Sequence, residues 1–130
     1  MHFVQLRSGE PRPARVLLVD DDAVVRRPVA RFLRARGLTV VEAGDGNDGL
    51  AALCAARFDA VVTDVSMPNC DGLRFWTRAT ERHPGLRGRF LFCTASDVRN
   101  AVVAAGERFL RKPFELDELW SLLEPLLPSP

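Results

Sequence analysis

Four apolar stretches of this 130-residue sequence each end on a side chain that could take part in phosphoryl chemistry. The side chains are a row of three carboxylates at Asp20–Asp22, a carboxylate at Asp64, a hydroxyl at Thr94 and an ammonium at Lys112. Carboxylates bind hard cations such as Mg²⁺, while a hydroxyl or an ammonium can contact phosphoryl oxygens. A carboxylate can also accept a phosphoryl group itself. The four stretches therefore indicate phosphoryl transfer, provided that the fold brings them together.

Asp64 is central to this hypothesis because it ends a run of apolar and β-branched residues that is typical of a buried strand. An acid at the carboxyl end of a central strand lies where α/β sheets bind their ligands. Taken alone, Asp64 is read more simply as an acid that caps the following loop. Convergence of other reactive side chains would decide between the two interpretations.

Lys112 is the only lysine among eighteen basic residues, and all the others are arginines. A chain that uses arginine for almost every cation can keep a lysine where a compact ammonium on a flexible stem is needed. Chance is the alternative, and the place of Lys112 in the fold distinguishes the two.

The apolar pattern predicts five strands that alternate with five helices. The strands are expected at residues 16–19, 38–43, 60–64, 89–94 and 109–110, and the helices at residues 24–36, 48–57, 73–83, 97–105 and 114–126. Crossovers of this length favour a parallel sheet that is covered on both faces. We therefore expect a doubly wound α/β fold, flavodoxin-like, with five parallel strands in the order 2-1-3-4-5.

Two helix starts carry specific expectations. Pro28 lies beyond the first turn of the first helix, so it should kink that helix or delay its start. The short fourth helix has Ser96 and Asp97 as candidate caps.

In the predicted strand order, the reactive residues end their strands at one crevice. Asp20, Asp21 and Asp64 would repel one another there unless a bound cation relieved them, and Mg²⁺ is the natural choice. Thr94 and Lys112 would then flank phosphoryl oxygens, which leaves Asp64 as the nucleophile.

Length and composition indicate one globular domain at residues 15–127, with a loose arm at residues 1–14 and a short tail at residues 128–130. The net charge of +1 gives no reason to expect nucleic acid or an anionic membrane as a partner. No apolar run approaches the ~20 residues of a membrane span, and no signal peptide is evident, so we expect a cytoplasmic protein. Three scattered cysteines fit reduced thiols.

Four motifs in order resemble the response-regulator receiver domains of two-component signalling, and the likeness covers residues 14–127. They are Val-Leu-Leu-Val-Asp-Asp-Asp, Val-Val-Thr-Asp-Val-Ser-Met-Pro with Asp71-Gly72 after it, Phe-Cys-Thr-Ala-Ser, and Phe-Leu-Arg-Lys-Pro-Phe. The resemblance implies that Asp64 accepts phosphate from a kinase phosphohistidine and that Thr94 and Lys112 contact it.

The resemblance also implies the metal ligands and the switch. Asp21 would bind Mg²⁺ directly with Asp64, Asp20 would assist, and the Ser66 carbonyl would be a further ligand. Phe109 matches an aromatic switch position, where an ordinary core phenylalanine is the alternative. The Lys112–Pro113 bond matches a bond that is usually cis in the family. Only eighteen positions separate Thr94 from Lys112, a few fewer than the family pattern, and the shortage falls in the fourth helix.

These features favour a stand-alone receiver, a phosphoacceptor switch that is not an enzyme beyond its own phosphorylation and dephosphorylation. The expected partners are a histidine kinase or a histidine phosphotransfer protein, with a homodimer or a downstream protein possible on the last helices. A receiver-like interaction module that is never phosphorylated is one alternative. A receiver fragment of a larger regulator or of a hybrid kinase is another. An aspartyl-phosphate hydrolase is disfavoured because Ser66 stands where that chemistry needs an acid.

Overall fold

The computed structural model describes residues 12–68 and 70–128. Of the arm expected at residues 1–14, residues 1–11 lie outside the described part, and so do residues 129–130 of the expected tail. Within the described residues, no helix is long and apolar enough to cross a membrane.

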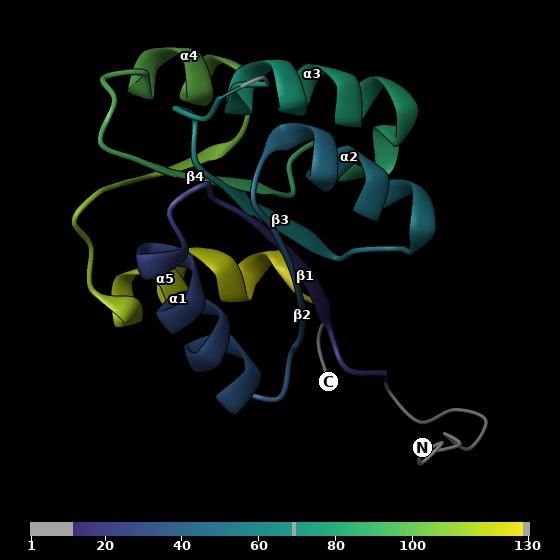
Figure 1. Cartoon of the computed structure of the whole chain (residues 1–130), viewed down its shortest axis with the longest axis vertical. Coiled ribbons are helices and arrows are strands. Elements are labelled where there is room, and N and C mark those ends of the chain that lie inside the picture. Colours follow the sequence, from purple (N-terminus) through teal and green to yellow (C-terminus); the bar gives the residue numbers. More distant parts are fainter. Residues whose placement is uncertain (1–11, 69, 129–130) are drawn as a thin grey trace.

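Five parallel strands form one sheet in the predicted order, β2-β1-β3-β4-β5 (Figure 1). The strands are β1 (Arg15–Val19), β2 (Thr39–Ala43), β3 (Ala60–Thr63), β4 (Phe90–Thr94) and β5 (Arg108–Arg111). Since all five run in the same direction, their carboxyl ends meet at one edge of the sheet. The prediction of a flavodoxin-like sheet is confirmed.

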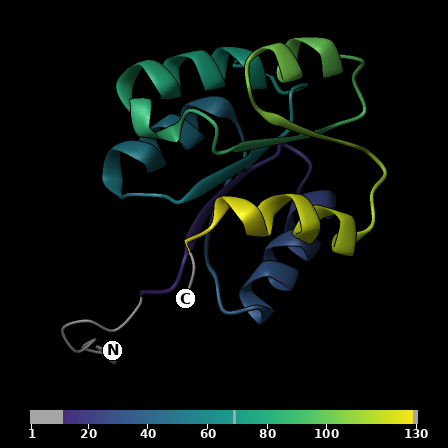
Figure 2. The same ribbon diagram turned by 180° about the vertical axis from the view of Figure 1, so that it is seen from behind.

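Helices cover both faces of this sheet. They are α1 (Ala23–Ala35), α2 (Gly46–Ala55), α3 (Gly72–Arg82), α4 (Arg99–Ala104) and α5 (Leu116–Leu123), with 3-10 turns at Pro84–Leu86 and Glu124–Leu126. α1 and α5 lie side by side on one face, as both views show, and α2, α3 and α4 cover the other (Figures 1 and 2).

The core consists of two apolar layers because successive strand residues point to opposite faces. In β1, Val16 and Leu18 pack beneath α1 and α5, whereas Leu17 and Val19 pack beneath α2 and α3. The second layer also holds Phe75, Phe90 and Phe92, whose rings contact in sequence with centroid distances of 5.8 Å. The rigid layers on both faces fix where each strand ends.

The expected delay at the start of α1 is wrong. The helix begins at Ala23, where the Asp22 side chain caps it by accepting a hydrogen bond from the Val24 amide at 3.0 Å. Pro28 lies inside the helix and removes only the bond that the Val24 carbonyl would accept. Val24 is 83% exposed, so water can replace that bond. The exposed first turn of α1 therefore accommodates the proline.

The fourth helix is short, as expected, but its predicted cap is wrong. α4 has six residues, follows Val98, and begins without a capping side chain. Ser96 instead directs its hydroxyl to the Ser66 hydroxyl, and its carbonyl accepts the Val98 amide. The loop after β4 therefore serves the neighbouring loop rather than the helix.

Candidate functional site

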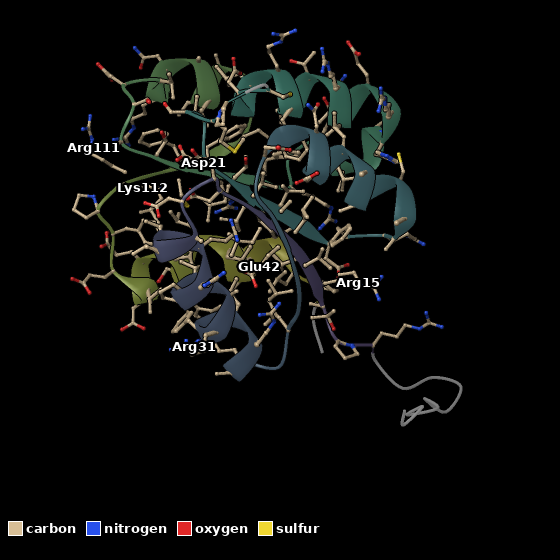
Figure 3. The ribbon with its side chains drawn as sticks, in the orientation of Figure 1. Arg15, Asp21, Arg31, Glu42, Arg111 and Lys112 are labelled. Carbon is tan, nitrogen blue, oxygen red and sulfur yellow. The ribbon has the colours of Figure 1, made fainter. Side chains whose placement is uncertain are left out.

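The reactive residues predicted from the sequence lie together at the carboxyl edge of the sheet. Asp20 directly follows β1, Asp64 directly follows β3, Thr94 ends β4 and Lys112 directly follows β5. Figure 3 shows Asp21 and Lys112 at this end of the sheet and Arg15 at the other. Carboxylate oxygens of Asp20, Asp21 and Asp64 all lie within 4.8 Å of one another.

Lys112 joins two of these acids. Its Nζ donates to Asp20 Oδ2 at 2.7 Å and to Asp64 Oδ2 at 2.9 Å. Burial lowers the pKa of Lys112, but the hydrogen bonds and negative charges of Asp20 and Asp64 raise that pKa by more, so the net shift is upward. The ammonium therefore stays charged at neutral pH and compensates one of the three carboxylates.

Asp64 has two oxygens in different environments. Oδ1 accepts hydrogen bonds from the backbone amides of Val65 at 2.6 Å and Ser66 at 3.2 Å. The hydrogen-bond partner of Oδ2 among the described residues is Lys112, at 2.9 Å. Because Asp64 is 8% exposed and its Oδ1 is held by two amides, the carboxylate has a fixed orientation, and Oδ2 lies beside the ammonium that also binds Asp20.

Thr94 is buried, and its hydroxyl is oriented by a neighbour. Its Oγ1 accepts the Ser96 amide at 3.1 Å, and its carbonyl accepts the Lys112 amide at 3.0 Å. The hydroxyl hydrogen remains available to a group in the crevice, since the Ser96 bond uses a lone pair. The Ser66 and Ser96 hydroxyls hydrogen-bond to each other at 2.5 Å and so join the loops that follow β3 and β4.

Sequence reasoning missed the groups that hold Asp20. The Asp22 amide donates to Asp20 Oδ1 at 2.9 Å, and Arg26 Nη1 donates to the Asp20 carbonyl at 2.7 Å. Arg26 is fixed in turn by Glu42 at 3.1 Å. The sequence shows only that Arg26 lies one helical turn after the acids. This spacing does not predict that its guanidinium binds the backbone carbonyl of Asp20.

Gly72 was visible only as part of a motif. A Cβ atom on Gly72 would overlap the Asp64 carbonyl oxygen, so no larger residue fits without a shift of the backbone. The start of α3 therefore packs directly against the residue that carries the central carboxylate.

Two other expectations concern β5 and its end. The Lys112–Pro113 bond is cis, as predicted. Phe109 is partly buried against the layer beneath α3 and α4, which is compatible with both a switch and a core side chain. Next to the site, burial raises the pKa of the Cys93 thiol far above its ordinary value, so Cys93 is an inert core residue.

The donor set suits Mg²⁺. Its ligands would be carboxylate oxygens, which are the hard donors that this ion prefers. Three carboxylates and one ammonium also leave a net charge of about −2, which a divalent cation neutralises.

Comparison with known proteins gives one consistent result. The family model of the response regulator receiver domain matches residues 16–124. The probable transcriptional regulatory protein TcrX of Mycobacterium tuberculosis is 34% identical over 126 residues, which cover 94% of this chain and 53% of TcrX. The response regulator MprA of Mycolicibacterium vanbaalenii is 39% identical over 119 residues, which cover 88% of this chain and 51% of MprA.

A solved structure agrees with these relatives. The chemotaxis protein CheY4 of Vibrio cholerae superposes with a TM-score of 0.81 at 30% identity, and the match covers 89% of this chain and 100% of CheY4. The present chain spans about half the length of TcrX and MprA.

Proposed function

This chain belongs to the family of response regulator receiver domains, and on that premise we propose that its phosphoacceptor is Asp64. Receiver domains are phosphoacceptor switches of two-component signalling. The observation that carries the assignment is the pair of bonds from Lys112 to Asp20 and Asp64. Through these bonds Lys112, at the end of β5, meets the acids that follow β1 and β3. The other oxygen of Asp64, Oδ1, is already held by the Val65 and Ser66 amides.

The step assigned to Asp64 is an in-line displacement. Oδ2 forms a bond to phosphorus while the bond from phosphorus to the phosphohistidine nitrogen breaks, and that nitrogen keeps the electron pair. The Val65 and Ser66 amides hold Oδ1 so that the attacking oxygen does not rotate away. Positioning and charge compensation are therefore the main contributions of the protein to this step.

Asp20, Asp21 and Asp64, with the Ser66 carbonyl, are the groups that would hold Mg²⁺. The ion would supply positive charge against the phosphoryl oxygens. Lys112, which binds both Asp20 and Asp64, supplies a second positive charge, and the Thr94 hydroxyl supplies a neutral donor. These roles use side chains from four strand ends, which explains why no single motif defines the site.

We assign the switch to Thr94 and Phe109. When the Thr94 hydroxyl turns to the phosphoryl group, space opens beneath it, and Phe109 on the adjacent strand β5 can move inward. A phenylalanine has no hydroxyl, so this movement would be driven by packing alone.

The donor is a histidine kinase or a histidine phosphotransfer protein, and the surroundings are cytoplasmic. The chain would act within a longer regulator, by homodimer formation or by contact of α4 and α5 with a downstream protein. The half-length match to TcrX and MprA supports the longer regulator.

Substitution of the acceptor tests the proposal. Asp64→Asn should abolish labelling by ³²P-acetyl phosphate with Mg²⁺, whereas Asp48→Asn, on the exposed first turn of α2, should label like the wild type. Circular dichroism would show that both variants are folded. Undiminished labelling of folded Asp64→Asn would overturn the assignment, and a wild type that never labels would favour the unphosphorylated interaction module.

A further inference from the structure

A cavity of about 580 Å³ lies at the amino ends of the strands, far from Asp64. It is formed where α2 leads into β3 and where α3 leads into β4 (Figure 1), at the end of the sheet opposite to Asp21 and Lys112 (Figure 3). Its volume falls within the range of about 300–1,000 Å³ that is typical of small-molecule sites. We call it the amino-end cavity.

Two arginines give this cavity a positive wall. Arg57 is exposed and takes part in none of the ion pairs between described residues. Arg89 is fixed, because its Nη1 donates to the Leu126 carbonyl at 2.7 Å and to the Asp59 carbonyl at 3.4 Å. That leaves Nε and Nη2 of Arg89 for another partner. Two guanidinium groups at one cavity are suited to phosphate oxygens.

Asp59 is the one acid in the lining, and it already has a partner. Its Oδ2 accepts the Arg15 amide at 2.8 Å, which holds the carboxylate toward the start of β1. The formal charge of the lining is therefore positive even with a neutral His83.

The rest of the wall suits a flat group that carries hydrogen-bond donors. Phe58, which is partly exposed, provides apolar surface beside the buried Leu53 and Leu86, and an aromatic ring can stack on a base. The last residues of α2 also line the cavity, and the helix offers their carbonyls no further amide donors. These carbonyls disfavour a bare anion but can accept hydrogen bonds from an amine or a hydroxyl.

His83 adds an unsatisfied polar atom. Its Nε2 is buried and has no hydrogen-bond partner among the described residues, although the side chain lines the cavity. A half-turn of the imidazole about the Cβ–Cγ bond would move Nε2 to the other side of the ring, where a ligand in the cavity would be its hydrogen-bond partner. A ligand that provides this partner would be favoured, because an unpaired buried polar atom is destabilising.

We propose that the amino-end cavity binds a nucleoside diphosphate, with its phosphates against Arg57 and Arg89 and its base against Phe58. This site goes beyond the phosphoacceptor function and shares no residue with it. Because α2 and α3 both begin at the carboxyl edge and end at the cavity, a bound nucleotide would stabilise the helices that flank Asp64.

Nuclear magnetic resonance of the ¹⁵N-labelled chain tests the proposal. Adenosine diphosphate, added with EDTA so that the acidic cluster binds no Mg²⁺, should give saturable shifts at residues 53–59 and 83–89. Arg57→Gln should weaken binding about tenfold, the effect of losing one charge-assisted hydrogen bond. Arg87→Gln is the matched control, since Arg87 is exposed nearby but does not line the cavity, and it should change binding less than about twofold.

Shifts that never saturate, or that centre on Asp20 and Asp64, would overturn the proposal. Equal weakening of binding by Arg57→Gln and Arg87→Gln would show that general charge attraction, and not the cavity, explains the binding. If pyrophosphate bound as tightly as adenosine diphosphate, the nucleoside would make no contribution and that part of the proposal would be wrong. Asp64→Asn should keep the shifts, and Arg57→Gln should keep acetyl-phosphate labelling. Failure of the cavity and failure of the phosphoacceptor site are therefore separable.

Discussion

Two buried carboxylates, at opposite ends of the sheet, show what distinguishes a reactive acid from a structural one. Asp64 and Glu107 are 8% and 6% exposed. Glu107 accepts hydrogen bonds from the Trp76 indole at 2.9 Å, the Gly88 amide at 2.8 Å and the Phe90 amide at 2.9 Å, so both of its oxygens are occupied. Asp64 has one oxygen held by amides and the other beside Lys112 in a cluster that retains negative charge.

The two carboxylates differ in how far their hydrogen-bonding and charge are satisfied, and not in how deeply they are buried. Three N–H groups donate to the two carboxylate oxygens of Glu107, and these hydrogen bonds link α3 and the turn before β4 to the start of β5. The cluster at Asp64 still favours a divalent cation and offers an oxygen for a new bond. The same residue chemistry is therefore structural at one end of the sheet and reactive at the other.

Removal of Lys112 should have the largest effect at the reactive end. Lys112→Ala should lower the rate of phosphoryl uptake from acetyl phosphate by about 10²-fold or more, because a fixed charge at the developing phosphoryl group is lost. Labelling rates at saturating Mg²⁺ would measure this. Arg111→Ala, which alters the exposed neighbour, should leave the rate near that of the wild type, and equal losses in the two variants would contradict the assigned role.

Removal of Glu107 should affect stability and not chemistry. Glu107→Ala leaves the Trp76, Gly88 and Phe90 donors unpaired and should cost about 3 kcal/mol of unfolding free energy in urea. Glu107→Gln should also be destabilising, because an amide offers only one acceptor oxygen. Exposed Glu124→Ala is the control. Labelling per folded molecule should be retained, and a selective loss of labelling would make Glu107 part of the reactive end.

Gly72→Ala should disturb the reactive end through the backbone. The added Cβ would overlap the Asp64 carbonyl oxygen, so the start of α3 has to move, at a cost of about 1–3 kcal/mol. Gly85→Ala, where a Cβ meets nothing within 4 Å, should be close to neutral. Thermal unfolding and labelling rates would be compared, and equal stability of the two variants would show that the contact is not tight.

Mg²⁺ should stabilise only one end of the molecule. At a concentration of 100 Kd it should add about 2.7 kcal/mol to the unfolding free energy of the wild type. Asp21→Asn should weaken this effect, and because Asp21 is exposed it should change the stability in EDTA little. Asp48→Asn should respond to Mg²⁺ like the wild type. An unchanged Mg²⁺ response in Asp21→Asn would contradict the ligand assignment.

Alkaline pH should give the smallest effect. The raised pKa of Lys112 means that its contribution is complete below about pH 10.5 and is lost as the pH rises further. The raised pKa of Cys93 causes a further loss of folding stability above about pH 9, because the thiol ionises in the unfolded chain before it does so in the folded one. The chain has no tyrosine, so few other groups titrate there. Urea titrations at several pH values would measure the unfolding free energy. Lys112→Gln should abolish only the fall in stability above about pH 10.5, and a pH profile unchanged from that of the wild type would contradict the ion-pair geometry.

The sequence predicted the parts of the molecule that depend on pattern. Apolar runs specified the five strands, and the parallel order brought Asp20, Asp64, Thr94 and Lys112 to one edge. The convergence also overturned the simpler reading of Asp64 as a loop cap, although its Oδ1 does hold the Val65 and Ser66 amides.

Features that depend on tertiary contacts were not predictable. The bond of Arg26 to a backbone carbonyl and the three donors of Glu107 join residues whose spacing shows no period. Pro28 was misjudged because the carbonyl that it leaves without an amide donor belongs to Val24, which is exposed to water on the first turn of the helix. Ser96 was misjudged as a cap because its hydroxyl has a partner in another loop.

Mapping of the phosphorylated residue tests the central claim most directly. The wild type would be treated with acetyl phosphate and Mg²⁺, the acyl phosphate would be reduced with borohydride, and the digest would be sequenced by mass spectrometry. A single homoserine at position 64 is the predicted product, since reduction converts an aspartyl phosphate to that residue. Homoserine at position 20, 21 or 22 instead, or none in a chain that binds Mg²⁺, would contradict the account.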